Sequence, residues 1–446
     1  MHTVIPLARA RHAQGVLDLN GHADIRRFHA GVGSLDVLRA LRGSRQRQRP
    51  LALTLRWPAS APEAYRRSLA QEIHLVGCHL GSRQPVDYFQ WRGPAPVGDV
   101  QALMAPLFER LHFLEHDRGD YGIDLDPRHT DWASVGVLRE LGFNRVCIGV
   151  PDARAEDDYS RAYCRDPAPI ESLIDAARTF DFRSVSVDLG YGSAWQTLAS
   201  FEAKLASLIA LEPDRLQVFD YATPPSRYPA QPAQALCSAA DKTAMRQLCF
   251  ARLDAAGYHY IGLGQFARGD DDLTQAQERG RLSRTCEGFT LHGYCDHIGL
   301  GLGAISQIDT LCAQNATDEQ RYAQALGNGQ LATCQGWQCD TGDALREYVA
   351  ERLACDLELD IQAIERRYGV MFARHFSTIW PLLEQWNCEG LIELSAQFLC
   401  VLPAGRTRVD ELCGLFELPI ARSEPNPECG SGLARESGGS VDQSGA

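Results

Sequence analysis

Strand-forming and helix-forming segments alternate along most of this 446-residue chain, and this alternation constrains the fold more than any other feature. Short apolar runs with high β-propensity occur at LALTLR (51–56), VDYFQW (86–91), YGIDLD (121–126), RVCIGV (145–150), SVSVDL (184–189) and RLQVFDY (215–221). Each run is followed by a helical pattern, as between 130 and 142, where apolar side chains recur at every third or fourth position. Short apolar strands separated by helices form parallel sheets. The sequence therefore predicts an α/β fold with a full or partial barrel.

Composition and spacing divide the chain into four predicted regions. Residues 1–50 are Arg-rich and predict an irregular N-terminal segment with a helix near 35–41. Residues 51–335 predict the barrel with an extension, and residues 336–420 predict a mainly helical C-terminal domain. Within that domain we expect helical segments over 344–355, 360–376 and 380–394 and a strand over 397–402. Residues 421–446 predict a disordered tail, because they have almost no large apolar groups to offset the entropy of ordering.

Charge and cysteine usage exclude several classes of protein. With 44 basic and 57 acidic residues the net charge is -13, which repels phosphate backbones and argues against nucleic-acid binding. No apolar run reaches the roughly 18 residues of a membrane span, and the first residues lack the apolar core of a secretory signal. The 15 cysteines contain no C-x-x-C pair and are expected to be reduced thiols. We therefore expect a cytoplasmic protein.

Several blocks of sequence carry a resemblance to a known family. In chain order they are LRELGFNRVCIGV (138–150), LEPDRLQVFDYAT (211–223), GYHYIGLGQFARGDDDL (257–273), GFTLHGYCDHIGLGLGAISQI (288–308) and the GR-x6-C-x2-F stretch (405–416). Together they resemble the oxygen-independent coproporphyrinogen III oxidases, the HemN type of radical SAM enzymes. The resemblance implies a partial (β/α)6 barrel of the TIM type followed by a helical, winged-helix-like domain. It also implies a [4Fe–4S] cluster, S-adenosylmethionine (SAM) and the oxidative decarboxylation of two porphyrinogen propionates to vinyl groups.

The chain departs from this family where the cluster would be bound. The family places C-x3-C-x2-C directly after the first barrel strand, because three thiolates hold the cluster and leave one iron open to SAM. Here Ser60 stands in place of the first cysteine, and the loop that would carry the other two is deleted. A serine hydroxyl is a poor ligand for such iron. From this departure we expect no metal, no catalytic residue and neither family cofactor.

The resemblance leaves five positions as residual cofactor-binding candidates: Gly93, Asp124, Arg165, Asp188 and Ala222. The two aspartates follow strands at the carboxyl ends where barrel enzymes keep their sites, although capping of the next helix explains them equally well. Gly93 lies in WRGPAP, where the family has W-G-G-G-T-P, so two glycines and the threonine of the family are lost. Arg165 is able to bind a carboxylate, or belongs to a solvated charged surface.

Two further groups of residues have open interpretations. Trp57, Trp91 and Trp195 lie at or near predicted strand ends, where they either fill the mouth of the barrel or belong to the core. Cysteines and histidines recur among His292, Cys295, His297, Cys334 and Cys339, but their spacings match no tetrahedral zinc pattern. We therefore predict no metal site from these residues.

Three functions remain compatible with the sequence. The main prediction is a catalytically inactive member of the family that binds haem, a porphyrin or a protein of the haem pathway. The first alternative is an active oxygen-independent coproporphyrinogen III oxidase. The second alternative is a non-catalytic interaction or structural protein without a small ligand. The oligomeric state is not specified by any of these patterns.

Overall fold

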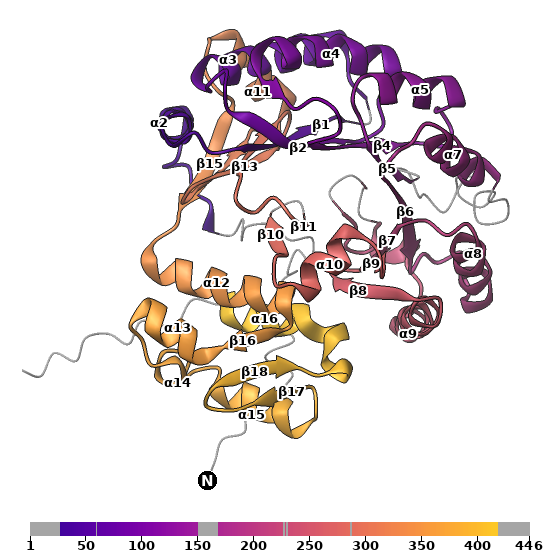
Figure 1. The fold of residues 1–446 in the computed structure, drawn as a ribbon, viewed down its shortest axis with the longest axis vertical. Coiled ribbons are helices and arrows are strands. Elements are labelled where there is room, and N and C mark those ends of the chain that lie inside the picture. Colours follow the sequence, from indigo (N-terminus) through magenta and orange to yellow (C-terminus); the bar gives the residue numbers. More distant parts are fainter. Residues whose placement is uncertain are drawn as a thin grey trace, which may run out of the picture.

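The computed structural model describes residues 27–58, 60–149, 168–225, 228, 231–285 and 288–417. Its largest element is a curved sheet in which consecutive strands of the barrel are parallel neighbours (Figure 1). The parallel strands are β1 (Leu51–Arg56), β2 (Pro85–Arg92), β4 (Asp120–Leu125), β5 (Arg145–Ile148), β6 (Ser184–Tyr191) and β7 (Arg215–Asp220). The helices that cover their outer face are α3 (Glu63–His79), α4 (Val97–Arg110), α5 (Trp132–Glu140), α7 (Ala168–Thr179), α8 (Leu198–Ala210) and α9 (Ala239–Ala255). The predicted α/β barrel is therefore confirmed.

Further strands, most of them antiparallel to their neighbours, extend the sheet at both edges. At the β1 edge, β12 (Asp296–Leu300) pairs in parallel with β1 and is followed by β13 (Ile305–Ile308), β14 (Leu311–Asn315) and β15 (Thr333–Gln338). At the β7 edge lie β9 (Gln265–Arg268) and β8 (Tyr258–Gly262), and the two-residue β3 (His112–Phe113) pairs with β2. Smaller elements are α2 (Ser34–Arg47), the 3₁₀ turn η2 (Ala233–Ala235), α10 (Asp272–Glu278), β10 (Ser283–Thr285), β11 (Gly288–Thr290) and α11 (Glu319–Gly327). The ends of the sheet, β15 and β8, do not pair with each other in the described part of the chain, so the barrel is open.

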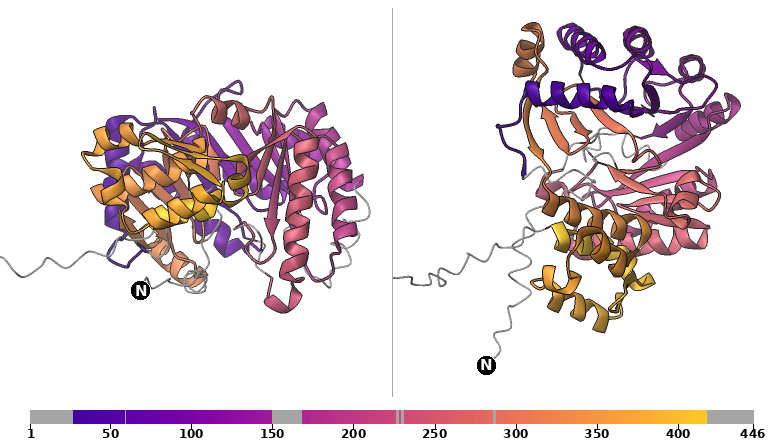
Figure 2. Two further views of the ribbon diagram at one scale, coloured as in Figure 1. Left: turned by 90° about the horizontal axis from the view of Figure 1, so that it is seen from below. Right: turned by 60° about the vertical axis from the view of Figure 1, so that its left-hand side comes forward.

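The C-terminal part packs below the barrel around a hydrophobic core of its own (Figures 1 and 2). Its elements are α12 (Thr341–Asp356), β16 (Glu358–Asp360), α13 (Ile361–Tyr368), α14 (Phe372–His375), α15 (Trp380–Cys388), β17 (Ile392–Leu394), β18 (Phe398–Val401), the 3₁₀ helix η3 (Pro403–Arg408) and α16 (Val409–Glu417). Polar contacts join it to the barrel; for example, Arg352 Nη2 donates to the Leu282 carbonyl over 3.0 Å. This part is mainly helical, as predicted, while the domain boundaries at 50, 335 and 420 stay predictions.

Two of the predicted helical segments are interrupted by glycines. Gly369 has a φ of 66° and ends α13, and Gly390 has a φ of 70° just after α15. Because glycine adopts this left-handed conformation without steric cost, it stops the helix at each place. The prediction of a helical segment through 394 is wrong, since 392–394 form β17 in a small antiparallel sheet with β16 and β18.

Local sequence explains why the barrel elements form. Strand β1 is buried almost throughout, as expected for a parallel strand covered on both faces. Several helices begin at a polar side chain that accepts a backbone hydrogen bond, including Asp131 before α5 and Thr197 before α8.

Among the described residues no helix combines the length and the apolar character that a membrane crossing requires.

A buried carboxyl group joins α3 to the antiparallel edge of the sheet. Glu72 is 2% exposed and accepts hydrogen bonds from the Gly301 amide (2.7 Å), Asn315 Nδ2 (2.6 Å) and the Tyr322 hydroxyl (2.6 Å). Burial raises the pKa of Glu72 to about 7 despite these three donors, because the low-polarity surroundings penalise the charged form. No sequence pattern predicts this contact, since the partners of Glu72 lie more than 200 positions away in the chain.

Glu72 is expected to make the protein less stable as the pH rises. Its pKa in the unfolded chain is near 4.5, so between pH 4.5 and 7 the folded state binds more protons and loses stability with each step in pH. Relative to Glu72→Gln, the wild type should lose about 3 kcal/mol of unfolding free energy across this range. Urea unfolding of both proteins at several pH values measures the difference. Parallel pH profiles of the two proteins would contradict the prediction.

Candidate functional site

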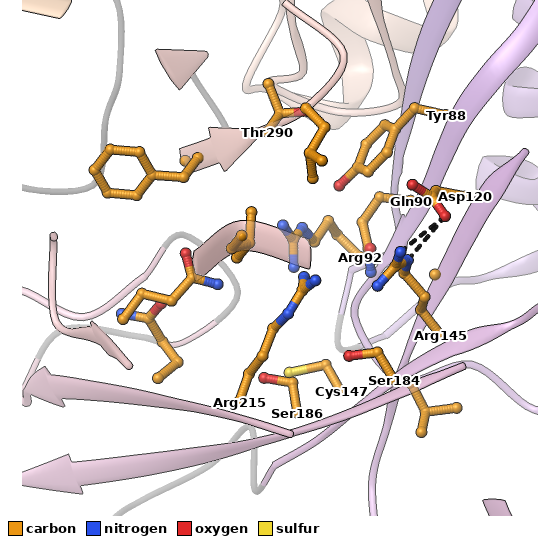
Figure 3. A pocket seen from close by; sticks show the side chains of 18 of the residues that line it. Tyr88, Gln90, Arg92, Asp120, Arg145, Cys147, Ser184, Ser186, Arg215 and Thr290 are labelled. Atoms are coloured by element: carbon orange, nitrogen blue, oxygen red, sulfur yellow. Dashed lines mark hydrogen bonds and ion pairs between the residues drawn. The ribbon is translucent and has the colours of Figure 1, made fainter. Parts of the chain in front are cut away.

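A cavity of about 150 Å³ lies inside the barrel, between the strands and the segment 288–292 (Figure 3). Its walls come from alternate positions of neighbouring strands, because successive side chains of a strand point to opposite faces. The polar and charged residues among them are Tyr88, Gln90, Arg92, Asp120, Arg145, Ser184, Ser186, Arg215, Gln217, Gln265, Thr290 and His292. A barrel interior lined in this way can hold a polar or charged ligand.

Two arginines face each other across this cavity. The guanidinium groups of Arg92 and Arg215 point toward one another in Figure 3. Arg215 Nε donates to Asp271 Oδ2 over 2.8 Å, while its Nη2 is buried without a hydrogen-bond partner among the described residues. An unsatisfied guanidinium nitrogen in a buried position is costly, so it indicates a missing acceptor. A carboxylate is the acceptor that a guanidinium group recognises best.

A charged network lies on β4 and β5, two of the strands between those that carry Arg92 and Arg215. Asp120 accepts from His292 Nε2 (2.9 Å) and is paired with Arg145 (2.9 Å) and Arg183 (3.3 Å), and Arg145 also contacts Asp272 (2.7 Å). Burial alone would raise the pKa of Asp120, but His292 and Arg145 outweigh it and hold that pKa well below its usual range. Asp120 therefore stays negatively charged and holds the side chains of His292 and Arg145 in place.

Gly93 and Asp124, both predicted cofactor-binding residues, are brought into contact. The Gly93 amide donates to Asp124 Oδ2 over 3.0 Å, and Gln90 Nε2 donates to Asp124 Oδ1 over 3.1 Å. Arg92 pairs with the same carboxylate at 3.5 Å. Asp124 therefore organises the end of β2 and orients Arg92, and neither Asp124 nor Gly93 lines the cavity itself.

Gly93 is required by a close approach of the backbone. Its φ is 94°, and a Cβ atom there would lie 2.2 Å from the Trp57 carbonyl oxygen. We expect Gly93→Ala to destabilise the fold by at least about 1–3 kcal/mol, because both the backbone conformation and the contact become unfavourable. Thermal unfolding measures the change. Gly98→Ala is the matched control, since no atom lies within 4 Å of a Cβ there, and an equal loss of stability in both variants would contradict the argument.

Of the other three predicted candidates, Asp188 and Ala222 lie apart from this contact. Asp188 accepts hydrogen bonds from the Tyr228 hydroxyl and from Cys147 Sγ (3.3 Å). Ala222 donates its amide to Asp220 Oδ1 over 2.8 Å within a turn. Arg165 lies outside the described residues. Whether any of these positions contacts a cofactor stays a prediction.

Two of the three tryptophans lie in the core, and two of the candidate metal ligands lie close together. Trp57 and Trp91 are buried in the main hydrophobic core with ring centroids 5.5 Å apart, which favours the core interpretation over a filled barrel mouth. His297 is hydrogen-bonded to Thr54 over 2.9 Å on the adjacent strand. His292 and Cys295, in contrast, lie near one another, close to Asp87.

The arginines of the cavity are not among the residues predicted from the sequence. Arg92, Arg145 and Arg215 lie in strands whose remaining residues are largely apolar. A charged side chain at alternate positions of a buried strand was the available signal, because such a residue must face the barrel interior. The strand pattern alone does not reveal that the three arginines share one cavity.

Fold and cavity together define an open α/β-barrel protein whose interior cavity is lined in part by arginines. Residues 340–407 match the HemN C-terminal domain. The chain is 40% identical over 417 residues to the oxygen-independent coproporphyrinogen III oxidase of Pseudomonas aeruginosa, covering 87% of this chain and 90% of that protein. It is 33% identical to the Salmonella typhimurium protein of the same name, covering 80% and 79%. The chain belongs to the oxygen-independent coproporphyrinogen III oxidase family.

A solved relative matches nearly the whole structure. It is described as coproporphyrinogen III oxidase (HemN) from Escherichia coli, a radical SAM enzyme, and superimposes with a TM-score of 0.81 at 29% identity, covering 92% of this chain and 98% of that one. The expectation that no cofactor is used is contradicted by these comparisons, because radical SAM relatives carry a [4Fe–4S] cluster and SAM. The main prediction of a catalytically inactive member receives no support from these comparisons, because the relatives are named as oxidases.

The segment between β1 and α3 is where the resemblance places the cluster. Its described residues Trp57, Pro58, Ser60, Ala61 and Pro62 carry no thiolate. Twelve cysteines lie elsewhere in the described residues, and the nearest in sequence is Cys78 at the end of α3. The residues of this segment do not fit a cluster held by three thiolates from one loop, so we derive no catalytic step through such a cluster.

Proposed function

We propose that this chain binds a porphyrinogen with propionate side chains in the barrel and acts as an oxygen-independent coproporphyrinogen III oxidase. The observation that carries the proposal is the buried Arg215 Nη2, which has no acceptor in the described part of the chain and points with Arg92 into the cavity. A propionate carboxylate supplies that acceptor with two oxygens in the geometry of a guanidinium group. The names of the relatives support the same substrate.

The residues of the chain suggest how one propionate would be held. Arg215 is oriented by Asp271, and Arg92 is oriented by Asp124, so the two guanidinium groups are positioned before a ligand arrives. The Arg145–Asp120–His292 network fixes the part of the cavity wall that β4 and β5 form between them. Positioning by buried ion pairs reduces the entropy that binding must otherwise overcome.

A second candidate is binding of the porphyrinogen without its oxidation. The segment between β1 and α3 favours it, because its described residues provide no thiolate. The two candidates share the ligand and differ in turnover, so a single pair of measurements separates them.

Anaerobic growth and ligand binding together test the proposal. The gene is introduced into a haem-auxotrophic strain that lacks its own coproporphyrinogen oxidases, and the purified chain is assayed anaerobically for SAM cleavage and bound iron. Rescue of growth with SAM cleavage is expected for the oxidase. Saturable porphyrin binding without rescue, despite good expression, selects the second candidate, and no binding refutes both.

A further inference from the structure

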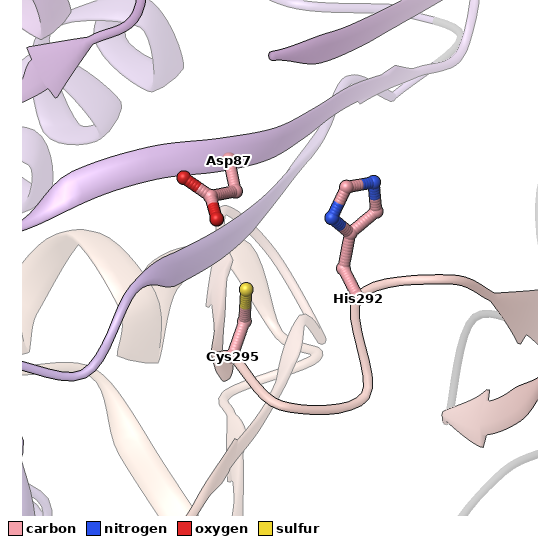
Figure 4. Close-up of side chains that lie close together, drawn as sticks. All are labelled: Asp87, His292 and Cys295. Atoms are coloured by element: carbon pink, nitrogen blue, oxygen red, sulfur yellow. The ribbon is translucent and has the colours of Figure 1, made fainter. Parts of the chain in front are cut away.

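A second group of ligand-type side chains lies at the edge of the barrel, outside the arginine pair. Asp87 comes from β2, while His292 and Cys295 come from the turn between β11 and β12 (Figure 4). One carboxylate oxygen, one ring nitrogen and the Cys295 sulfur all lie within 4.8 Å of one another. Cys295 is buried, and the other two side chains are partly exposed. The three donors therefore converge on one point that solvent can reach.

The orientation of His292 prepares one of its nitrogens for a metal. Its Nε2 lies 2.9 Å from Asp120 Oδ2, and because a carboxylate only accepts hydrogen bonds, Nε2 carries the proton. The lone pair is then on Nδ1, which lies 3.3 Å from the Tyr294 hydroxyl on the side of Asp87. A histidine whose second nitrogen donates to a carboxylate is the usual arrangement behind a metal ligand. Asp120 is in turn held by Arg145 and Arg183.

We propose that Asp87, His292 and Cys295 bind a divalent transition-metal ion, and that this ion is zinc. Oxygen, imidazole nitrogen and thiolate sulfur are the donors of zinc sites, and three protein ligands leave a fourth position for water. Zinc bonds of about 2.0–2.3 Å bring tetrahedral donors to within about 3.7 Å, so the side chains must close by about 1 Å. The Tyr294 hydroxyl donates to Asp87 over 2.8 Å, and this residue is 52% exposed, so its side chain has room to move away from Asp87.

The site joins segments that are distant in sequence, which gives it a structural consequence. Asp87 and His292 are about 205 positions apart, and an ion between them ties β2 to the turn that leads into β12. His292 also lines the arginine-containing cavity, so the ion would fix part of its wall. The spacing of cysteines and histidines within 292–339 predicts no metal site. Asp87 lies outside that stretch, and only the fold brings it close to His292 and Cys295.

Metal titration of the full-length chain tests the proposal. The purified, reduced and chelator-treated protein is titrated with Zn²⁺ and, separately, with Co²⁺, whose bond to a thiolate produces a charge-transfer absorption. We expect one equivalent of Zn²⁺, a rise in the melting temperature on binding, and the cobalt–thiolate band. Cys295→Ser should abolish the band and weaken Zn²⁺ binding by about tenfold or more, and Asp87→Asn should weaken binding while keeping the band.

Matched variants separate this site from other thiols. Cys78 is exposed and lies 3.7 Å from His74 Nε2, so Cys78→Ser tests an alternative two-ligand site and should leave binding unchanged. Tyr294→Phe should retain the band, because the hydroxyl is not a ligand. A melting temperature of metal-free Cys295→Ser equal to that of the metal-free wild type shows that the variant folds. An unchanged cobalt band in Cys295→Ser, or no band in the wild type, overturns the proposal.

Discussion

Replacing Arg215 with lysine is expected to weaken the binding of coproporphyrin III about tenfold to a hundredfold. A lysine retains a positive charge beside Asp271 but loses the planar pair of donors that includes the buried Nη2. Hydrogen bonds to charged groups contribute about 1.5–3 kcal/mol, which corresponds to this range of affinity. Quenching of porphyrin fluorescence during titration with each protein gives the two dissociation constants.

Arg252→Lys provides the control for this measurement. Arg252 lies on α9 and pairs with Glu202 at the surface, so its replacement removes a guanidinium group without touching the cavity. Binding should be unchanged in that variant. Equal affinities of Arg215→Lys and the wild type would remove the argument that Arg215 holds a carboxylate.

Trp91→Ala is expected to destabilise the barrel by about 3–5 kcal/mol without improving ligand binding. Trp91 is completely buried and packs against Trp57 in the main core, so its removal leaves a large cavity. The neighbouring residues Gln90 and Arg92 point to the opposite face of β2, into the ligand cavity, so the indole does not occupy that space. Urea unfolding measures the stability, and porphyrin titration measures the binding.

Trp91→Phe separates the loss of volume from the loss of the indole nitrogen. The Nε1 group of Trp91 has no hydrogen-bond partner among the described residues, so phenylalanine removes an unsatisfied donor while keeping an aromatic ring. This variant should lose much less stability than Trp91→Ala. Tighter porphyrin binding by Trp91→Ala at unchanged stability would instead restore the interpretation that tryptophans fill the barrel mouth.

His292 belongs both to the proposed zinc site and to the wall of the proposed porphyrinogen cavity. This residue contacts Asp120 in the wall of the cavity, and it also contributes the nitrogen of the proposed metal site. Occupation of the metal site is therefore expected to rigidify one wall of the ligand cavity. Because Arg215 and Cys295 are tested by different probes, failure of either proposal leaves the other open to its own measurement.

The sequence alone determined the family, the order of strands and helices, and the helical C-terminal part. The family follows from the resemblance of ordered blocks such as 257–273. The order of elements follows from local properties, since apolar runs such as 51–56 predict buried strands and helical spacing such as that after residue 130 predicts the helices that cover them. Interruptions by Gly369 and Gly390 were not recognised, because a single glycine is compatible with a helix until its backbone adopts a positive φ.

The tertiary structure decided which side chains meet. Arg92 and Arg215 belong to strands more than 120 positions apart, and only the curvature of the sheet turns both toward one cavity. Glu72 is buried against Gly301, Asn315 and Tyr322 because α3 packs against α11 and β12. Burial, charge pairing and ligand geometry depend on distances between segments, and the spacing of residues along a chain does not contain those distances.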